Sequence, residues 1–223
     1  MIALIDYRAG NLTSVKKALA AIGADVFVPV RPQDLAAARG IIVPGVGHFG
    51  ATRALDLTWV EAIRARLDEG CPLLGICLGM QWLYEGSDEA PELKGVGVFA
   101  GRCYRLGALK SKVAQPFKAA DDAGLKPCAT PGQIKVPHVG WNSLTLVRDA
   151  SIADGIASGA QVYFTHSYVA PVTADAAAVS DHGEPFASIV QRGRIAGVQF
   201  HPEKSGEIGL RILRNWLSDV AHA

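Results

Sequence analysis

Short apolar runs alternate with amphipathic stretches through the first third of the chain. The apolar runs predict short buried strands. They span residues 2–5, 25–30, 40–43 and 72–76. Between them, residues 11–22 and 59–69 predict helices, the first with Asn11 as its N-cap, and a glycine follows each. Because strands alternating with helices are typical of parallel βαβ units, we predict an α/β fold with a doubly wound, mostly parallel sheet.

The pattern changes in the second half, where short β-like runs dominate. These runs predict antiparallel strands joined to the main sheet. They span residues 96–104, 143–147, 161–165, 176–179, 187–191 and 195–200. The last stretch, 207–220, predicts a helix with Leu210, Leu213 and Leu217 along one face. Residues 107–133 are the least patterned part, and a connection of this length is either a functional excursion or structureless.

Length, composition and charge narrow the class of protein. The 223 residues suffice to bury one full core, and we predict a single domain over residues 1–223. A hydrophobic fraction of 49% with 19% charged residues indicates a globular protein. The net charge of +1, without a basic stripe, argues against a nucleic-acid partner. The chain starts with a strand pattern that reaches Asp6 at once and contains no membrane-length apolar run, so we predict a cytoplasmic protein.

The cysteines and histidines do not predict a metal site or a disulfide framework. No C-x-x-C spacing occurs among Cys71, Cys77, Cys103 and Cys128. Cys71 and Cys103 lie in apolar stretches and are predicted to be inert buried thiols. The other histidines show no ligand spacing, so we predict no metal and no cofactor. They are His48, His138, His166 and His222, together with His182, which is predicted to be solvated in a turn.

Cys77 stands at the end of the predicted strand 72–76, within G-I-C-L-G. This pattern resembles the nucleophile elbow G-x-S-x-G with sulfur in place of oxygen. Small residues at 75 and 79 let strand and helix approach closely and leave the Cys77 side chain exposed at the sheet edge. The helix N-terminus favours a thiolate and offers the Leu78 N–H to an oxyanion. The alternative interpretation is a buried cysteine in a glycine-containing turn.

His201 and Glu203 supply the base and the carboxylate that a thiol nucleophile requires. They follow the apolar run 195–200, and residues two apart in an extended segment point to the same side. The alternative for an isolated H-P-E is a solvated histidine at a strand end. Together with Cys77, the pair predicts Cys-His-Glu acyl transfer.

The loop Gly45-Val46-Gly47 lies at the end of another predicted strand. Its two glycines allow positive φ and can expose backbone N–H groups, so the loop is a candidate oxyanion hole. A simple β-to-α turn is the alternative. Because chemistry collects at the carboxyl ends of parallel strands, the loop and Cys77 could face one another.

Six motifs occur in this order in one known family. They are I-D-Y-R-A-G-N-L at 5–12, P-G-V-G-H-F at 44–49, G-I-C-L-G-M-Q at 75–81, V-P-H-V-G-W-N at 136–142, Y-F-T-H-S-Y at 163–168 and G-V-Q-F-H-P-E-K-S at 197–205. With them the chain closely resembles the class I (triad) glutamine amidotransferases, of flavodoxin-like fold. Within that superfamily it resembles the glutaminase subunits of imidazole glycerol phosphate synthases, from histidine biosynthesis.

The resemblance implies a residue-by-residue chemistry. Cys77 attacks the carboxamide of glutamine and forms a γ-glutamyl thioester, His201 protonates the leaving ammonia and later activates water, and Glu203 orients His201. The oxyanion is met by the Leu78 N–H and by an N–H of the Gly45-Val46 peptide, which turns over in the family. The amino-acid end of glutamine is held by Gln81 and by the backbone of Ser167 and Tyr168.

The resemblance also implies a partner. The family forms a heterodimer with a (β/α)8 cyclase, which receives ammonia through a closed channel. The cyclase yields imidazole glycerol phosphate and an aminoimidazole carboxamide ribotide. The residues that match the interface are Pro137, Trp141, Asn142, Tyr163 and Lys204. The family has a short connection before V-P-H-x-G-W-N, so residues 107–133 are predicted to be an insertion beside this interface.

Three alternatives remain from the sequence. Glutaminase partners of anthranilate or aminodeoxychorismate synthase share the triad but lack P-G-V-G-H-F and V-P-H-x-G-W-N. A stand-alone cysteine hydrolase would act without a partner. A non-catalytic binding module is disfavoured by the intact Cys77, His201 and Glu203.

Overall fold

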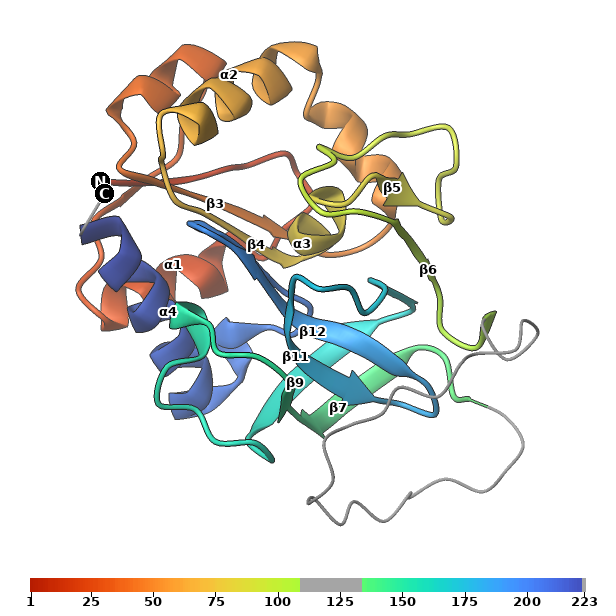
Figure 1. The fold of residues 1–223 in the computed structure, drawn as a ribbon. Coiled ribbons are helices and arrows are strands. Elements are labelled where there is room, and N and C mark those ends of the chain that lie inside the picture. The colour runs from red at the N-terminus through yellow and green to blue at the C-terminus, as the bar shows by residue number, and fades with distance from the viewer. Residues whose placement is uncertain (109–133, 222–223) are drawn as a thin grey trace.

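A central eight-stranded sheet organises the protein, whose computed structural model describes residues 1–108 and 134–221 (Figure 1). Its strands, in spatial order, are β2 (Val26–Phe27), β1 (Ile2–Leu4), β3 (Gly40–Gly45), β4 (Leu73–Cys77), β13 (Ile195–Val198), β12 (Pro185–Arg192), β11 (Ala176–Asp181) and β8 (Thr145–Leu146). The first five strands are mutually parallel. The last three add in antiparallel fashion. The predicted α/β class with a mostly parallel sheet is confirmed.

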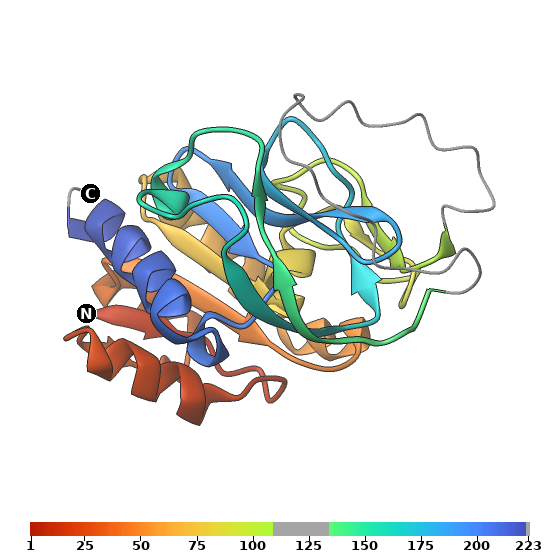
Figure 2. The same ribbon diagram turned by 90° about the horizontal axis from the view of Figure 1, so that it is seen from below.

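Helices cover both faces of the sheet. On one face lie α1 (Leu12–Ala21) and α4 (Gly206–Ala221), side by side in Figure 2. The other face carries α2 (Leu57–Asp68), α3 (Leu78–Trp82) and the short 3₁₀ segments η1 (Pro32–Ala37) and η2 (Phe49–Ala54). Because side chains alternate along a strand, β1 contributes to the apolar clusters on both faces of the sheet. Ile2 and Leu4 belong to the cluster on one face, and Ala3 belongs to the cluster on the other.

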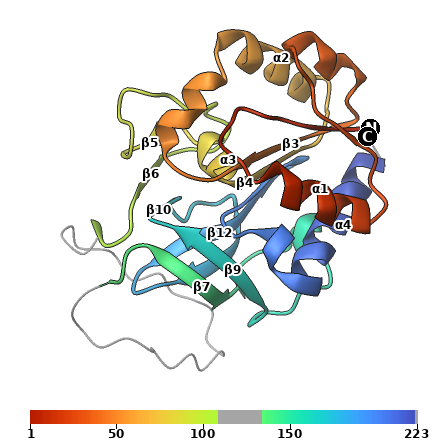
Figure 3. The same cartoon turned by 180° about the vertical axis from the view of Figure 1, so that it is seen from behind.

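Two smaller sheets and two short 3₁₀ segments complete the described part. One small sheet contains β10 (Tyr168–Val169), β6 (Arg102–Arg105) and β5 (Gly86–Ser87), and the other pairs β7 (His138–Ser143) with β9 (Gln161–His166). The β7–β9 pair lies on the side of the central sheet away from α2 (Figures 1 and 3). The 3₁₀ segments are η4 (Ser151–Ala153) and η5 (Pro202–Lys204).

Helix ends follow the signals in the sequence. The Asn11 side chain accepts from the Ser14 N–H and caps α1 as predicted. Asp56 caps α2 through the Thr58 and Trp59 N–H groups, so this helix starts two residues before the predicted Trp59. Gly70, with φ of +83°, turns the chain after α2.

Several predicted strands differ from the structure. The run 25–30 forms only Val26–Phe27, because Pro29 has no N–H to continue the ladder. The strand predicted over 96–104 does not form before Arg102, because Gly97 and Gly101 take positive φ and turn the chain. Similarly, 143–147 divides between the end of β7 and β8.

Strand partners also correct the prediction. The run at 195–200 forms β13, which pairs parallel to β4 and not antiparallel to it. The run at 161–165 and the end of the run at 96–104, which forms β6, belong to the small sheets and not to the main one. In α4, Leu213 is buried as predicted, whereas Leu210 and Leu217 are only partly buried. The buried face of α4 is completed by Gly209, Ile212, Trp216 and Val220.

The predicted insertion at 107–133 lies almost entirely outside the described residues, which stop at 108 and resume at 134. Cys128 and His222 lie outside them as well. Within the described part, no helix is long and apolar enough to cross a membrane.

Candidate active site

Three neighbouring parallel strands bring the sequence motifs to one edge of the sheet. In their registers, Gly45 of β3 lies opposite Cys77 of β4, and Val198 of β13 lies opposite Ile76 of β4. Since parallel strands end at the same edge, the chain that leaves β13 reaches the turn that carries Cys77. The candidate nucleophile, the candidate oxyanion loop and His201 are therefore assembled by strand order.

Cys77 sits in a sharp turn between β4 and α3. Its backbone has φ of +53° and ψ of −107°, a conformation that side-chain-bearing residues rarely adopt. A Cβ on Gly75 would lie 2.7 Å from backbone atoms of Gly79, and a Cβ on Gly79 would lie 1.7 Å from the Val43 carbonyl oxygen. Only glycine fits at both positions, so the close approach predicted for a nucleophile elbow is present. The Cys77 side chain, however, is buried and not exposed as predicted, because neighbouring segments cover the sheet edge.

His201 and Glu203 form a buried pair. His201 Nδ1 and Glu203 Oε1 are 2.8 Å apart, and both side chains are almost fully buried. The other ring nitrogen, Nε2, is buried and has no hydrogen-bond partner within the described residues. Cys77 is close enough to raise the pKa of His201, so Nε2 is the free ring nitrogen that can face the sulfur. The arrangement suits proton exchange between His201 and the sulfur.

The charge of His201 follows from its neighbours. Burial disfavours the imidazolium, but Cys77 and Glu203 outweigh burial and raise the pKa of His201 to about 10. Near pH 7 the ring is therefore protonated beside the sulfur. A thiolate–imidazolium pair is the form in which a cysteine is nucleophilic.

Two hydrogen-bonded glutamine side chains lie beside Cys77, and one of them contacts the sulfur. Gln81 Nε2 donates to the Tyr168 carbonyl at 2.9 Å and to Gln199 Oε1 at 3.0 Å. Gln199 Nε2 donates to Cys77 Sγ at 3.6 Å. Gln199 was not predicted from the sequence, because its contacts are with residues distant in the chain.

The candidate oxyanion loop is not open in this structure. The Val46 N–H donates to the Ala9 carbonyl at 2.6 Å and is therefore already engaged. Beside it, Gly47 has φ of +96°. The buried Tyr7 hydroxyl has no described partner and lies against Gly45, where a Cβ would meet it at 2.0 Å. For Val46 to serve an oxyanion, its peptide would have to turn over.

The predicted glutamine-binding backbone at 167–168 is partly occupied. The Tyr168 carbonyl accepts from Gln81 and lies 3.1 Å from His166 Nδ1. The Ser167 carbonyl accepts from the Leu106 N–H. Tyr168 therefore lies beside α3, which follows Cys77, and the carbonyl groups of both residues hold neighbouring segments.

A histidine cluster next to the site was not foreseen. His138 Nδ1 and His166 Nε2 are 3.1 Å apart, and the His182 ring stacks on His138 with centroids 4.0 Å apart. His182 lies in the bend between β11 and β12 and is half-buried, and its ring also contacts His138 and the Lys135 carbonyl. Burial, and then His182, lowers the pKa of His138 to about 4, so its ring is neutral near pH 7.

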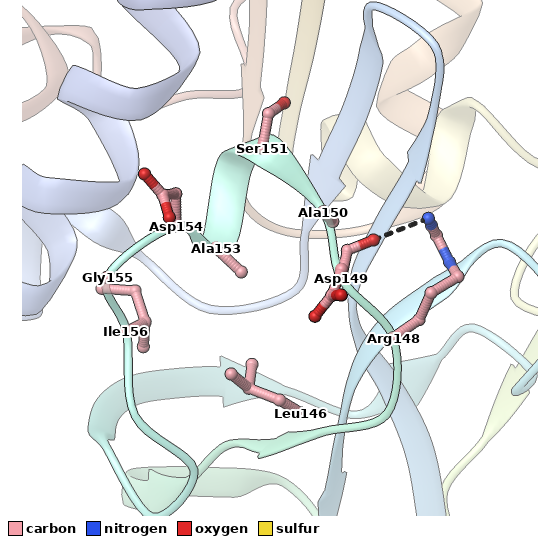
Figure 4. A pocket seen from close by; sticks show the side chains of 9 residues that line it. All are labelled: Leu146, Arg148, Asp149, Ala150, Ser151, Ala153, Asp154, Gly155 and Ile156. Carbon is pink, nitrogen blue, oxygen red and sulfur yellow. Dashed lines mark hydrogen bonds between the residues drawn. The ribbon is translucent and has the colours of Figure 1, made fainter.

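Cys71 and Cys103 are free and buried, as predicted. Across residues 1–108 and 134–221, His, Cys, Asp and Glu form no group of three that could hold a metal ion. A pocket of about 490 Å³ lies at the loop after β8, lined by nine residues between Leu146 and Ile156 (Figure 4). Its Arg148 is used to hold the carbonyls of Asp149, Asp175 and Gln191.

Comparison with known proteins decides the family. The model of the family "Glutamine amidotransferase class-I" matches residues 3–220. The chain belongs to the class-I glutamine amidotransferase family. The buried Cys77, His201 and Glu203 of this amidotransferase lie where the sheet order of the fold brings them together.

Relatives of this amidotransferase carry one name across distant organisms. "Imidazole glycerol phosphate synthase subunit HisH" of Moorella thermoacetica is 39% identical over 226 residues, with 100% of this chain and 96% of the relative covered. The Geobacillus kaustophilus protein of that name is 41% identical, with 97% and 96% covered. The Archaeoglobus fulgidus protein is 41% identical, with 99% of each covered.

Solved structures support the fold of the amidotransferase. A structure described as a glutamine amidotransferase aligns with a TM-score of 0.69 at 18% identity, covering 99% of this chain and 100% of the other. PurLQS from Thermotoga maritima aligns with a TM-score of 0.69 at 16% identity, covering 97% of each chain.

Three of the five residues predicted at a partner interface contact one another on the β7–β9 side of the amidotransferase. Trp141 is 57% exposed and packs edge-on against Tyr163, with ring centroids 6.1 Å apart. Lys204 Nζ lies over the same Tyr163 ring at 5.6 Å. Asn142, in contrast, is turned inward to the Asp181 carbonyl. Pro137 follows a cis peptide bond just before β7.

Proposed function

We propose that this chain is the glutaminase subunit of an imidazole glycerol phosphate synthase, in histidine biosynthesis. It hydrolyses glutamine to glutamate and ammonia. The observation that carries the proposal is the buried Cys77–His201–Glu203 constellation in a chain about 40% identical over its full length to subunits of that name. We also propose that residues 1–223 form one domain, since the family model spans nearly all of them.

In the proposed mechanism, the Cys77 thiolate attacks the carboxamide carbon of glutamine. The C–S bond forms as the carbonyl π bond opens to an oxyanion. The His201 imidazolium then gives its Nε2 proton to the nitrogen, and the C–N bond breaks to release ammonia and leave a thioester. His201, now neutral, takes a proton from water as its oxygen attacks the thioester, which releases glutamate and restores the thiolate–imidazolium pair. Glu203 holds His201 in the required tautomer throughout.

The oxyanion needs two donors in this mechanism, the Leu78 N–H and the Val46 N–H. Val46 can donate only after it leaves the Ala9 carbonyl, to which it is bonded at 2.6 Å. We propose that the resting loop keeps hydrolysis slow and that the partner with its ligand favours the turned peptide. Gln81, Ser167 and Tyr168 would line the amino-acid end of bound glutamine.

The partner in this proposal is a (β/α)8 cyclase that forms a heterodimer with the chain and uses the ammonia. Free ammonia would be protonated near pH 7 and lost, so a closed passage between the two subunits protects it. The exposed surface made by Val139 and Trp141, with Tyr163 and Lys204 beside it, is the proposed contact. Residues 107–133 would be an insertion near this contact.

The proposal is tested with Cys77→Ala in the assembled complex. Glutamine-dependent synthesis of imidazole glycerol phosphate should be lost, while synthesis from added ammonia should remain, because ammonia bypasses the thiol. Both reactions are followed by product formation with wild-type complex as control. Loss of both would refute the division of labour, and hydrolysis by the isolated chain at the rate of the complex would favour a stand-alone hydrolase.

A further inference from the structure

Gln199 is a buried side chain in contact with the sulfur, and the mechanism above gives it no role. It follows β13 directly, is fully buried, and lies between Gln81 and Cys77. Its own backbone N–H bonds to the Ser188 carbonyl of β12, which fixes the main chain at this point. A buried amide with both ends in polar contacts is rigid, because releasing either end would leave an unpaired polar group.

The hydrogen bonds determine which end of the Gln199 amide faces the sulfur. The Tyr168 carbonyl can only accept, so the Gln81 group that faces it must be the amide nitrogen. The second hydrogen on that nitrogen is directed to Gln199, which must therefore present its oxygen to Gln81. The nitrogen of Gln199 is then the end at Cys77 Sγ, 3.6 Å away. The Tyr168 carbonyl thus sets the orientation of both amides in this hydrogen-bonded relay, which runs from Gln81 through Gln199 to Cys77.

We propose that Gln199 is a catalytic residue whose side-chain N–H donates to Cys77 Sγ and stabilises the thiolate before it attacks. The proposal rests on the proposed function of Cys77 as the nucleophile. Gln81 is the positioning residue in this relay, since it holds the Gln199 amide in the donating orientation.

The chemistry favours this assignment over simple filling of the core. A thiolate accepts a hydrogen bond more strongly than a neutral thiol or a thioester sulfur does, so an N–H placed at Sγ stabilises the reactive form selectively. His201 approaches the same sulfur as a cation and is consumed as a proton donor during turnover. Gln199 carries no proton to lose, so its donation persists through each cycle.

The test is the pH dependence of Cys77 alkylation by iodoacetamide, with peptide mass spectrometry to separate Cys77 from the other cysteines. Gln199→Met keeps a similar volume and removes the donor. We expect its alkylation rate at pH 7 to fall roughly tenfold, with the midpoint of the rate profile moved up by about one pH unit. In the complex, kcat for glutamine hydrolysis should fall with KM for glutamine unchanged.

Gln191→Met is the matched control. Gln191 is also buried, in β12, but it bonds to Ser151 and the Gly193 carbonyl, away from Cys77. The Gln191→Met variant should be less stable than wild type, but its alkylation profile should not shift. If Gln199→Met does not fold, Gln199→Glu replaces it, since a carboxylate accepts from Gln81 as the native oxygen does. A negative charge at the sulfur should move the midpoint up further.

The outcomes separate the two proposals. An unchanged alkylation profile in a folded Gln199 variant would overturn the role of Gln199, even if its stability falls. A lowered kcat together with an unchanged profile would also overturn it, because the effect would not lie on the thiolate. Failure of the wild-type complex to hydrolyse glutamine would instead refute the proposed function, while the alkylation result would still report on Gln199.

Discussion

His201 keeps its positive charge because of two neighbours, and each contribution can be removed separately. Burial alone would lower the pKa of His201 below the usual 6.5, whereas Cys77 and Glu203 raise it to about 10. Cys77→Ala removes one of the raising contributions and leaves burial in place. We therefore predict that the pKa of His201 falls in this variant, as measured by NMR titration of the ring.

A lowered pKa means that His201 loses its proton at a lower pH, so a smaller fraction of the ring is imidazolium near neutral pH once the sulfur is absent. Cys71→Ala serves as the control, since Cys71 is buried elsewhere, near the Ala38 and Pro72 carbonyls. A His201 titration that is identical in Cys77→Ala and wild type would contradict the proposed contact between ring and sulfur.

Functional residues could be predicted from the sequence where the neighbouring residues in the chain indicate their chemistry. Cys77 is set off by its glycines and His201 by the strand that precedes it, so both were found. Gln199 and Tyr7 were not, because each acts through residues distant in the chain. Gln199 contacts Gln81 and Cys77, and Tyr7 lies against Gly45. No local pattern reports such pairings.

The packing of α3 onto β3 is the element-scale requirement of the site. A Cβ at Gly79 would lie 1.7 Å from the Val43 carbonyl oxygen, and both are backbone positions that side-chain rotation cannot relieve. We predict that Gly79→Ala lowers the free energy of unfolding by about 3 kcal/mol or prevents folding. Urea denaturation measures the change.

Gly10→Ala is the matched control for that variant. Its added Cβ would meet the flexible end of Leu12 at 3.3 Å, and Gly10 does not require positive φ. It should unfold within about 1 kcal/mol of wild type. Equal stability of both variants would mean that α3 can move away from β3, and the tight turn at Cys77 would then not depend on Gly79.

Elements buried on both faces were the easiest to predict, because their apolar runs are continuous. The segments of β1, β3 and β4 match the sequence closely. The predictions failed where contacts with residues distant in the chain determine the structure. Nothing in the run 195–200 reports that β13 inserts parallel to β4, between two halves of the sheet. Likewise, the buried Val96 and Phe99 lie in a loop, and their apolarity alone resembled a strand.

At the scale of the whole molecule, the hydrogen bond already made by the Val46 N–H predicts that the isolated chain hydrolyses glutamine slowly until its partner binds. The isolated chain offers this donor to Ala9, so the oxyanion would lack one of its two hydrogen bonds. Loss of one oxyanion donor costs on the order of a hundredfold in kcat. We predict a rise of roughly that size in glutamine hydrolysis when the cyclase and its ligand are added, measured as glutamate formed. A flat response would refute the regulated heterodimer.

The exposed Trp141 offers the sharpest test of where the partner binds. An indole that is 57% exposed and braced by the Tyr163 ring is costly in water and suited to an interface centre, where tryptophan often dominates affinity. We predict that Trp141→Ala weakens cyclase binding at least tenfold, by calorimetry, while Cys77 alkylation in the free chain is unchanged. Leu57→Ala is the control, because Leu57 is 77% exposed at the start of α2, across the central sheet from β7. Should Leu57→Ala weaken binding and Trp141→Ala leave it intact, the partner would dock on the α2 face. The β7–β9 surface would then not be the contact across which ammonia passes to the cyclase.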